Sequence, residues 1–536
     1  MSASRLKCNR LVGHLWEGSY AMAVRTESVE LAEFGYKQEL ERSLGSFSSF
    51  AAGFSYISIL TGVFQLFFFG FAMGGPAFWW TWPMVFTGQL LVALCFAELA
   101  ARFPIAGSVY QWSKQVAPPV VSWFAGWSML VGAVVTIAAV AVAYQVILPQ
   151  VSPRFQFIGG ASDIGVTNTP NGAKNAVVLA LGLVVITTAV NCIGVRLMAL
   201  INNIGVAAEL IGASLLILLL AIHIHRGPDV IFDTHGTGAG HGSGYLGAFL
   251  VASLMSAYVF YGFDTAGMLA EETNDPRRHA PINIIRAISA AAIVGGLLML
   301  VGMMAVGNIN AKEISVSGLP YIVKSTLGET LGNVFLIDSA VAITVCCLAV
   351  HTAAIRLMFS MARDDRLPFG SVIARVSGRS KTPIVPAVTI GAATLALLLI
   401  NIGNQTVFYL LTSVAIVLFY LSYLMTTFPM LMQRIRGAWP RADHGPYFSM
   451  GRWGMLVNIV AVTYGGLMII NLAWPRIEVY GNQTWYFRWG AFVIVGLMAL
   501  VGGAYYLTSQ RNKSGQVVAE HRADLVSAEA PIHPWP

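Results

Sequence analysis

The sequence predicts an all-α membrane protein with twelve transmembrane helices. Of its 536 residues, 56% are hydrophobic and only 11% are charged, whereas a soluble globular domain carries roughly 25% charged residues. The hydrophobic residues also gather in runs of the length that crosses about 30 Å of hydrocarbon as a helix. Within such a helix every backbone N–H and C=O group is hydrogen-bonded, which the hydrocarbon interior requires because it holds no water. The composition therefore excludes a soluble enzyme.

Twelve apolar runs follow one another along the chain, separated by short polar segments. The fourth and fifth are divided only by residues 194–196. We expect spans at residues 48–72, 79–103, 121–147, 175–193, 197–222, 246–270, 282–307, 334–361, 384–401, 407–432, 454–474 and 488–508.

The loop charges predict the orientation of these spans, because Lys and Arg accumulate in cytoplasmic loops. The loops on the side of the N-terminus hold about twice as many Lys and Arg residues as the loops on the other side. We therefore expect a multi-pass plasma-membrane protein with both tails, residues 1–47 and 509–536, in the cytoplasm. The net charge of +7 forms no basic patch, so we expect no nucleic-acid partner.

Two of the spans contain polar or flexible residues where an unbroken helix would be apolar. Span one holds Ser58 and Gly62, and span six holds Gly262 and Asp264. A single glycine in a membrane helix is commonly a packing position. Interruptions in spans one and six, however, have the spacing of two inverted halves, residues 48–222 and 246–432. Unwound backbone there offers N–H groups to a carboxylate and carbonyl groups to an ammonium, and an amino acid carries both.

Four sequence stretches occur in a characteristic order. They read LAEFGYKQEL at 31–40, AELAARFPIAGSVY at 97–110, YGFD at 261–264 followed by AEET at 270–273, and ARDDRLP at 362–368. Together they resemble the amino acid permeases of the amino acid-polyamine-organocation (APC) superfamily. The first stretch is similar to the branch that includes amino acid/choline and GABA permeases.

The resemblance implies a LeuT-type 5+5 inverted repeat over residues 48–432, with helices 1 and 6 discontinuous and two peripheral helices in 433–508. It also implies that Thr61 and Gly62 offer N–H groups to a substrate carboxylate, and that carbonyls near Ser58 and Phe263 receive the amine. Phe263 would additionally gate the site. Relatives commonly have Gly-x-Gly at the first break, whereas Leu60 stands at the first of these positions, which implies a narrower or reshaped pocket. The predicted substrate-binding residues are Ser58, Ile59, Thr61, Gly62, Tyr261, Gly262, Phe263 and Asp264.

Glu209 is an acidic residue near the middle of span five. A charge at that depth costs roughly 2.5 to 3.5 kcal/mol on insertion scales, so it needs a reason. We favour a proton-coupling role, in which Glu209 binds and releases a proton during a transport cycle. A structural hydrogen bond to a neighbouring helix and contact with a cationic substrate are the alternatives.

Further charged residues lie near the predicted gate and near the cytoplasmic helix ends. Asp264 is expected to cap the second half of span six, with attraction of the substrate amine as the alternative. Glu98 is expected to pair with Arg102 as an inner gate, and Glu271 and Glu272 with Arg277 or Arg278. Plain surface ion pairs are the alternative for each of these acids. His351 is expected to be a polar packing residue.

These features predict a secondary active transporter that imports an amino acid or related amine, with proton symport preferred over sodium. The alternative cargo is choline, GABA or a polyamine, and a further alternative is a nutrient sensor that does not transport. No Gly-x-x-x-x-Gly-Lys-Ser/Thr motif is present, so ATP is not expected to drive it. We expect no enzymatic activity, no cofactor and no metal, although the loop 223–241 holds four histidines.

Overall fold

The computed structural model describes residues 31–240, 243–400, 402, 407–440, 446–480, 485–513 and 521–522. Most of the two predicted tails, residues 1–30, 514–520 and 523–536, lies outside these ranges, as does His241 of the histidine-containing loop. Throughout the described ranges the regular structure is helical, and the only strand-like pairings are two isolated bridges, Tyr36 with Arg522 and Leu44 with Thr273.

The first half of the chain forms the helices of the first five predicted spans. They are α2 (Ser46–Ile57), α3 (Ile59–Gly74), α4 (Thr81–Arg102), α5 (Ser108–Val116), α6 (Pro119–Val142), α7 (Tyr144–Val151), α8 (Pro170–Ile193) and α9 (Val195–Ile222). A 3₁₀ turn, η1 (Pro76–Trp80), precedes α4. Pro at the first position of α6 and α8 suits a helix start, where its missing N–H has no partner to lose.

The second half repeats this alternation of long helices and short connecting turns. It comprises α10 (Tyr245–Val259), α11 (Thr265–Met268), η6 (Ala270–Glu272), α12 (Pro276–Ala305), α13 (Ile314–Ser317), α14 (Leu319–Arg363), α15 (Gly370–Ile373), α16 (Ile384–Ile400), α17 (Val407–Ile435), α18 (Gly454–Ala473), α19 (Ile477–Tyr480), α20 (Trp485–Arg488) and α21 (Gly490–Tyr505). Within α14 the backbone is non-helical at Gly328, which separates a short first part from the long second part.

Ten of the helical segments in the described chain are long and apolar enough to cross a membrane. They coincide with ten of the predicted spans. The other two predicted spans, 246–270 and 384–401, coincide with the shorter apolar helices α10 and α16. The protein is therefore a multi-pass membrane protein.

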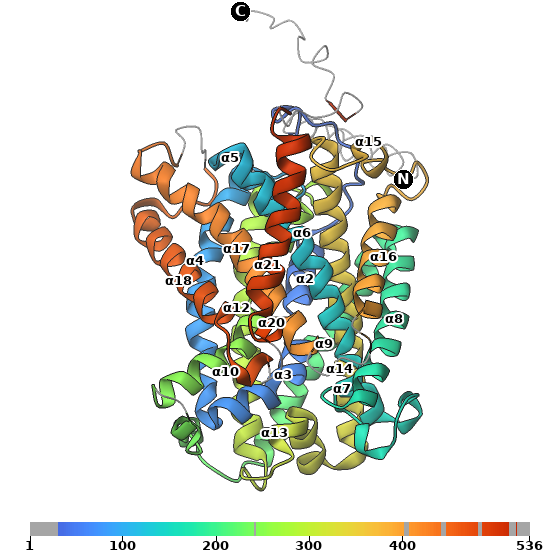
Figure 1. Cartoon of the computed structure of the whole chain (residues 1–536), viewed down its shortest axis with the longest axis vertical. Helices are drawn as coiled ribbons and strands as arrows, with labels where there is room; N and C mark the ends of the chain where they lie inside the picture. The colour runs from blue at the N-terminus through green and yellow to red at the C-terminus, as the bar shows by residue number, and fades with distance from the viewer. Residues whose placement is uncertain are drawn as a thin grey trace, which may run out of the picture.

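The long helices run side by side between two ends of the bundle (Figure 1). We call the end that carries residues 31–45, α5 and α15 the terminal face, and the end that carries α7 and α13 the opposite face (Figure 1). The first span, α2 with α3, is the most enclosed, with 89% of its apolar window buried, against 22% for the last span. The first span therefore lies in the core of the bundle.

The core is formed by helices from both halves of the chain. α3 packs against α10, α2 packs against α12, and α14 contacts both α2 and α3. α4 of the first half likewise packs along α12 of the second. These contacts bring the interruptions of spans one and six together in the middle of the bundle.

Candidate functional site

The first span is interrupted at Ser58, between α2 and α3. Ser58 has φ 34° and ψ 101°, outside the helical region. Its hydroxyl lies 2.7 Å from the Thr61 hydroxyl and accepts a hydrogen bond from the Thr61 N–H at 3.4 Å. Its carbonyl accepts from the Gly62 N–H at 3.0 Å. A serine tolerates this turn because its side chain replaces the backbone partners that α3 lacks at its first turn.

The break therefore lies at Ser58, and Gly62, which was expected to permit the break, lies four residues later. Gly62 lies inside α3, and a Cβ built on it would be 2.4 Å from Cγ2 of Val259 on α10. Gly62 is thus a close-packing position between two core helices. The N–H groups of Thr61 and Gly62, expected to face a substrate, instead donate to Ser58 in this structure. Ile59 begins α3 and is fully buried.

Glu209 of α9 occupies the N-terminal end of α3. One carboxylate oxygen accepts hydrogen bonds from the Leu60 N–H and from the Ser58 hydroxyl, both at 3.0 Å. The side chain is 1% exposed, and its second oxygen has no hydrogen-bond partner. A helix N-terminus favours a carboxylate through its unsatisfied N–H groups and its dipole. Leu60, which stands where relatives commonly have the first glycine of Gly-x-Gly, thus donates its N–H to the side chain of Glu209.

The sixth span is interrupted over residues 260–264, between α10 and α11. Gly262 has φ +85°, in the region that favours glycine. A Cβ at Gly262 would lie 1.9 Å from Cδ1 of Tyr56 on α2, so the two breaks approach too closely for any side chain there. The Gly262 N–H donates to the Tyr423 hydroxyl of α17 at 2.8 Å. Unlike Gly62, Gly262 is located at the break itself.

Asp264 does not cap α11 as expected, although it stands directly before that helix. Its side chain makes no capping hydrogen bond. Instead its two oxygens accept hydrogen bonds from the hydroxyls of Ser108 on α5 and Tyr423 on α17, each at 2.6 Å. Because Tyr423 also accepts from Gly262, it ties the second break to α17. Ser108 belongs to the stretch at 97–110 and Tyr423 to the predicted span 407–432, but neither was predicted as a partner of Asp264.

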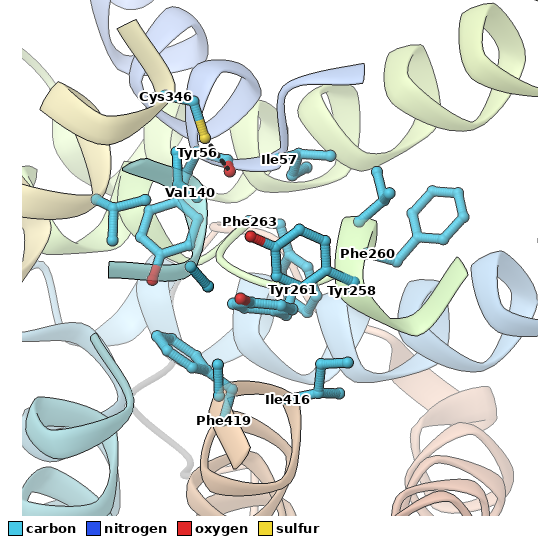
Figure 2. Close-up of a cluster of buried hydrophobic side chains, with 14 of the residues drawn as sticks. Tyr56, Ile57, Val140, Tyr258, Phe260, Tyr261, Phe263, Cys346, Ile416 and Phe419 are labelled. Atoms are coloured by element: carbon cyan, nitrogen blue, oxygen red, sulfur yellow. Dashed lines mark hydrogen bonds between the residues drawn. The ribbon is translucent and has the colours of Figure 1, made fainter. Parts of the chain in front are cut away.

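Aromatic rings surround the space between the two breaks (Figure 2). The Tyr261 ring lies 4.7 Å from Phe419 and 6.1 Å from Tyr56, measured between centroids. The Tyr261 hydroxyl bonds to Thr136 of α6 at 3.1 Å, while the Tyr56 hydroxyl is buried without a partner. We call Tyr56, Tyr258, Tyr261 and Phe419 the aromatic cluster. A buried phenol without a partner marks a place where a polar ligand gains a hydrogen bond.

Phe263, the expected gate, lies on the terminal-face side of the second break. It is fully buried, with its ring centroid 5.3 Å from Tyr423 and 6.0 Å from Phe96 of α4. Cys346 of α14 lies on another side of the aromatic cluster and donates to the Tyr56 carbonyl at 3.4 Å (Figure 2).

Buried ion pairs close the bundle between this region and the terminal face. Arg356 binds Glu272 at 2.7 and 3.1 Å, and Arg363 binds Glu271 through both of its terminal nitrogens. All four side chains are at most 2% exposed. The expected partners Arg277 and Arg278 instead bind Glu33 and Asp275.

Glu98 also has a partner other than the one expected. It pairs with Arg434 of α17 and accepts from the indole N–H of Trp439 at 2.9 Å. Arg102 is located at the end of α4 with its guanidinium over the Phe103 ring at 5.8 Å. Glu98 thus forms a tertiary contact with α17 in place of the expected pair with Arg102.

Residues 31–45, which we call the N-terminal segment, lie across the terminal face. The Tyr36 hydroxyl donates to Asp364 at 2.9 Å, and Arg363 lies 4.0 Å from the Tyr36 ring. Burial raises the pKa of Tyr36 to about 12, and the Asp364 carboxylate acts in the same direction. The backbone N–H groups of residues 43 and 44 donate to the Glu272 carbonyl. This segment therefore covers the ion pairs from outside.

A pocket of about 850 Å³ lies between α5 and the end of α17 on the side of the terminal face, and a smaller pocket of about 140 Å³ lies at the opposite face. The walls of the smaller pocket include Phe68 and Phe69 of α3, Tyr409 of α17, and Glu478 of α19. This pocket lies beside the C-terminal half of α3, the second helix of the interrupted first span. His351, in the core of α14, bonds to Thr187 and to the Ala387 carbonyl, consistent with polar packing. Among the described residues, no group of three or more His, Cys, Asp or Glu is arranged to hold a metal ion.

Sequence comparisons relate the chain to known transport proteins over nearly its full length. The model of a family described as amino acid permease matches residues 44–500. The amino-acid permease BAT1 of Arabidopsis thaliana is 27% identical over 92% of this chain and 96% of its own length. A BAT1 homolog of Oryza sativa subsp. japonica is 28% identical over the same shares of the two chains. Amino-acid permease 2 of Neurospora crassa is 24% identical over 94% and 91%.

Proposed function

The chain belongs to the amino acid permease family of the APC superfamily, and from this premise we propose that it imports an amino acid or related amine across the plasma membrane by proton symport. The substrate binds between the two helix breaks, and transport proceeds by alternating access. Both termini lie in the cytoplasm, so the terminal face is the cytoplasmic face.

The architecture that we propose is a twelve-helix bundle with a LeuT-type 5+5 inverted repeat. Span six crosses the membrane as α10 followed by α11 and η6, and span nine crosses it as α16. Two observations support the repeat. The first helix of each half is interrupted, and the second helices of the two halves, α4 and α12, pack along each other. Inverted repeats characteristically place discontinuous helices at the substrate site.

The position of Glu209 is the observation that carries the proton-coupling proposal. The N-terminus of α3 is the group best suited to a substrate carboxylate, yet Glu209 already accepts the Leu60 N–H there. Two carboxylates cannot share one donor, and like charges at one site repel. Protonation of Glu209 removes its charge and releases the Leu60 N–H to the substrate. Proton binding and substrate binding are then linked by a single hydrogen-bond donor.

The remaining contacts support a cycle with access from one face at a time. The ion pairs of Arg356 and Arg363 close the terminal face, while a pocket lies at the opposite face. We assign this arrangement to the outward-facing part of the cycle. Release to the cytoplasm requires η6 to separate from α14, with Phe263 moving with it. Glu98 holds α4 to α17 beside this route.

The second candidate cargo is choline, GABA or a polyamine, each of which carries a cationic amine or ammonium group. The aromatic cluster favours it, because aromatic faces attract ammonium groups. The unpartnered oxygen of Glu209 supplies a negative charge at the same place. A thermal-shift screen of the purified protein with amino acids, choline, GABA and polyamines identifies the cargo class independently of coupling.

The proton-coupling proposal is tested with Glu209→Gln in proteoliposomes. Gln has the uncharged shape of the protonated Glu209 side chain but cannot ionise, so we expect uptake to lose its response to an imposed pH gradient while substrate exchange continues. Asp229→Asn, which removes an exposed carboxylate at the opposite face, serves as the control and should respond like the wild type. An unchanged gradient response in Glu209→Gln would refute the role of Glu209.

A further inference from the structure

Asp338, on α14, is a further carboxylate within the membrane part of the bundle. It follows an apolar stretch in which Val334 and Ile337 are 54% and 52% exposed on the lipid-facing side of the helix. Asp338 itself is half-buried at the edge of that side. A carboxylate at such a depth costs roughly 2.5 to 3.5 kcal/mol on insertion scales, so a function is the first explanation to consider.

The side chain of Asp338 lies directly on the backbone of α9. A Cβ built on Gly212 would be 1.9 Å from the Oδ2 atom of Asp338, so only glycine leaves room for the carboxylate. At the other end of the same contact, Gly205 admits Val345 of α14 in the same way. Glu209 stands between these two glycines on α9. The glycines therefore bring α9 and α14 close together on both sides of Glu209.

Asp338 and Glu209 are arranged as neighbours along this contact. Gly212, which receives Asp338, follows Glu209 by three residues, an axial rise of about 5 Å. The charge of Asp338 acts on Glu209, and Cys346 is the other titratable group of α14 that faces Glu209. No ion pair of Asp338 occurs within the described chain. Cys346 retains its thiol proton far more readily than a carboxyl group does, which leaves the two acids as the exchanging pair.

Each acid has an oxygen that is not used by the protein. Among the residues that the structure describes, neither the Oδ2 atom of Asp338 nor the Oε2 atom of Glu209 has a hydrogen-bond partner, and both atoms are buried. Buried polar atoms are almost always satisfied, so two unsatisfied carboxylate oxygens on one helix contact indicate that a proton or water reaches them. The neighbouring Ser58 and Leu60 both bond to the other oxygen of Glu209.

Asp338 is also the nearer of the two acids to the opposite face. Gly212 is ten residues from the end of α9 at Ile222, a distance of roughly 15 Å along the helix, whereas Glu209 is roughly 20 Å from it. A proton that enters from the opposite face meets Asp338 first. Glu209 alone has contact with the first break.

We propose that Asp338 is the proton relay that loads Glu209 from the opposite face, which rests on the proposed proton symport. Asp338 takes a proton from water at that face and passes it to the Glu209 carboxylate. Glu209 then releases the Leu60 N–H, and Asp338 returns to its ionised form. Asp338 touches neither the first break nor the aromatic cluster, so it sets the rate of proton delivery and leaves substrate affinity unchanged.

The test compares Asp338→Asn with Asp338→Glu in proteoliposomes under an imposed pH gradient. We expect Asp338→Asn to lower the maximal uptake rate by on the order of 10²-fold, with the KM for substrate unchanged and a larger solvent deuterium isotope effect than the wild type. Asp338→Glu keeps a carboxylate and should retain gradient-driven uptake even if Asp338→Asn folds poorly. Glu329→Gln, an exposed acid earlier on α14, is the matched control.

The outcomes separate this inference from the proposed function. A wild type that ignores the pH gradient overturns both the symport proposal and the relay. A wild type that responds, with an Asp338→Asn variant of equal rate and equal isotope effect, overturns the relay alone. An Asp338→Glu variant that folds but transports no faster than Asp338→Asn also overturns it, because a carboxylate would then be insufficient.

Discussion

The buried pair of Arg356 and Glu272 offers a direct test of closure at the terminal face. Glu272→Gln leaves Arg356, which is 1% exposed, without its acid. Removing one partner of a buried pair costs about 3 to 5 kcal/mol. That cost applies only while the face is closed, because opening lets water reach Arg356. With each 1.4 kcal/mol equal to a factor of ten, the open form should become roughly 10² to 4 × 10³ times more populated.

Cys346 is a native reporter of that opening, since it is 2% exposed and lies beside Tyr56 in the core. With the other cysteines replaced, a membrane-impermeant thiol reagent applied at the terminal face should label Cys346 at least about tenfold faster in Glu272→Gln. Glu41→Gln is the control, because its partner Arg196 is 80% exposed and such a pair contributes about 0 to 1 kcal/mol. Equal labelling of the wild type and Glu272→Gln, or an equal rise in Glu41→Gln, would refute the reasoning.

Two further predictions concern packing and pH. Gly62→Ala should lower the free energy of unfolding by about 1 to 3 kcal/mol through overpacking. Adding Val259→Ala should restore it, because Cγ2 of Val259 is the atom that the new methyl group would overlap. Additive losses of stability in thermal unfolding of the double variant would contradict this explanation. The Tyr36 pKa of about 12 lies above its ordinary value of 10.0, so its stabilisation is complete below pH 10 and lost as the pH rises toward 12. The loss amounts to about 2 to 3 kcal/mol. Protection of the N-terminal segment from proteolysis should therefore fall between pH 10 and pH 12 in the wild type but not in Tyr36→Phe. Identical dependence of proteolysis on pH in the two proteins would contradict this role of the Tyr36 hydroxyl.

The positions of the helices were predictable because lipid imposes a strong constraint on sequence. A segment that crosses the membrane must be apolar and about twenty residues long, and this pattern can be read from local sequence alone. The segments that hold the two breaks were predictable for the same reason, since Ser58 and Gly262 stand in otherwise apolar runs.

The partners of the charged residues were not predictable from the local pattern. Glu98 was expected to pair with Arg102 because both lie near the cytoplasmic end of span two, yet it binds Arg434, which is 336 positions away in the sequence. A stronger signal was present for Arg356 and Arg363, which share a face of one membrane helix at a spacing of seven. Two arginines on a buried helix face require two acids, and the adjacent Glu271 and Glu272 supply them.

The location of the first break illustrates a different difficulty. Ser58 and Gly62 were both expected at the first break, with Gly62 permitting it because glycine is the most flexible residue. Flexibility and close packing both select glycine, and sequence alone does not distinguish them. The structure separates the two causes by φ and by neighbours. Gly262 has φ +85° and faces Tyr56, whereas Gly62 is helical and faces Val259.

Leu60 and Glu209 form one functional unit, although they lie 149 positions apart. A glycine at position 60 would carry no side chain beside the N–H that Glu209 accepts. With Leu60 the N–H is reached from the side of α9, where Glu209 accepts it. Under the proposed proton symport, the departure from Gly-x-Gly and the acid in the fifth span have one physical explanation, because Glu209 accepts the N–H of the residue that replaces the glycine. A Leu60→Gly variant should therefore weaken the dependence of uptake on Glu209 rather than abolish uptake.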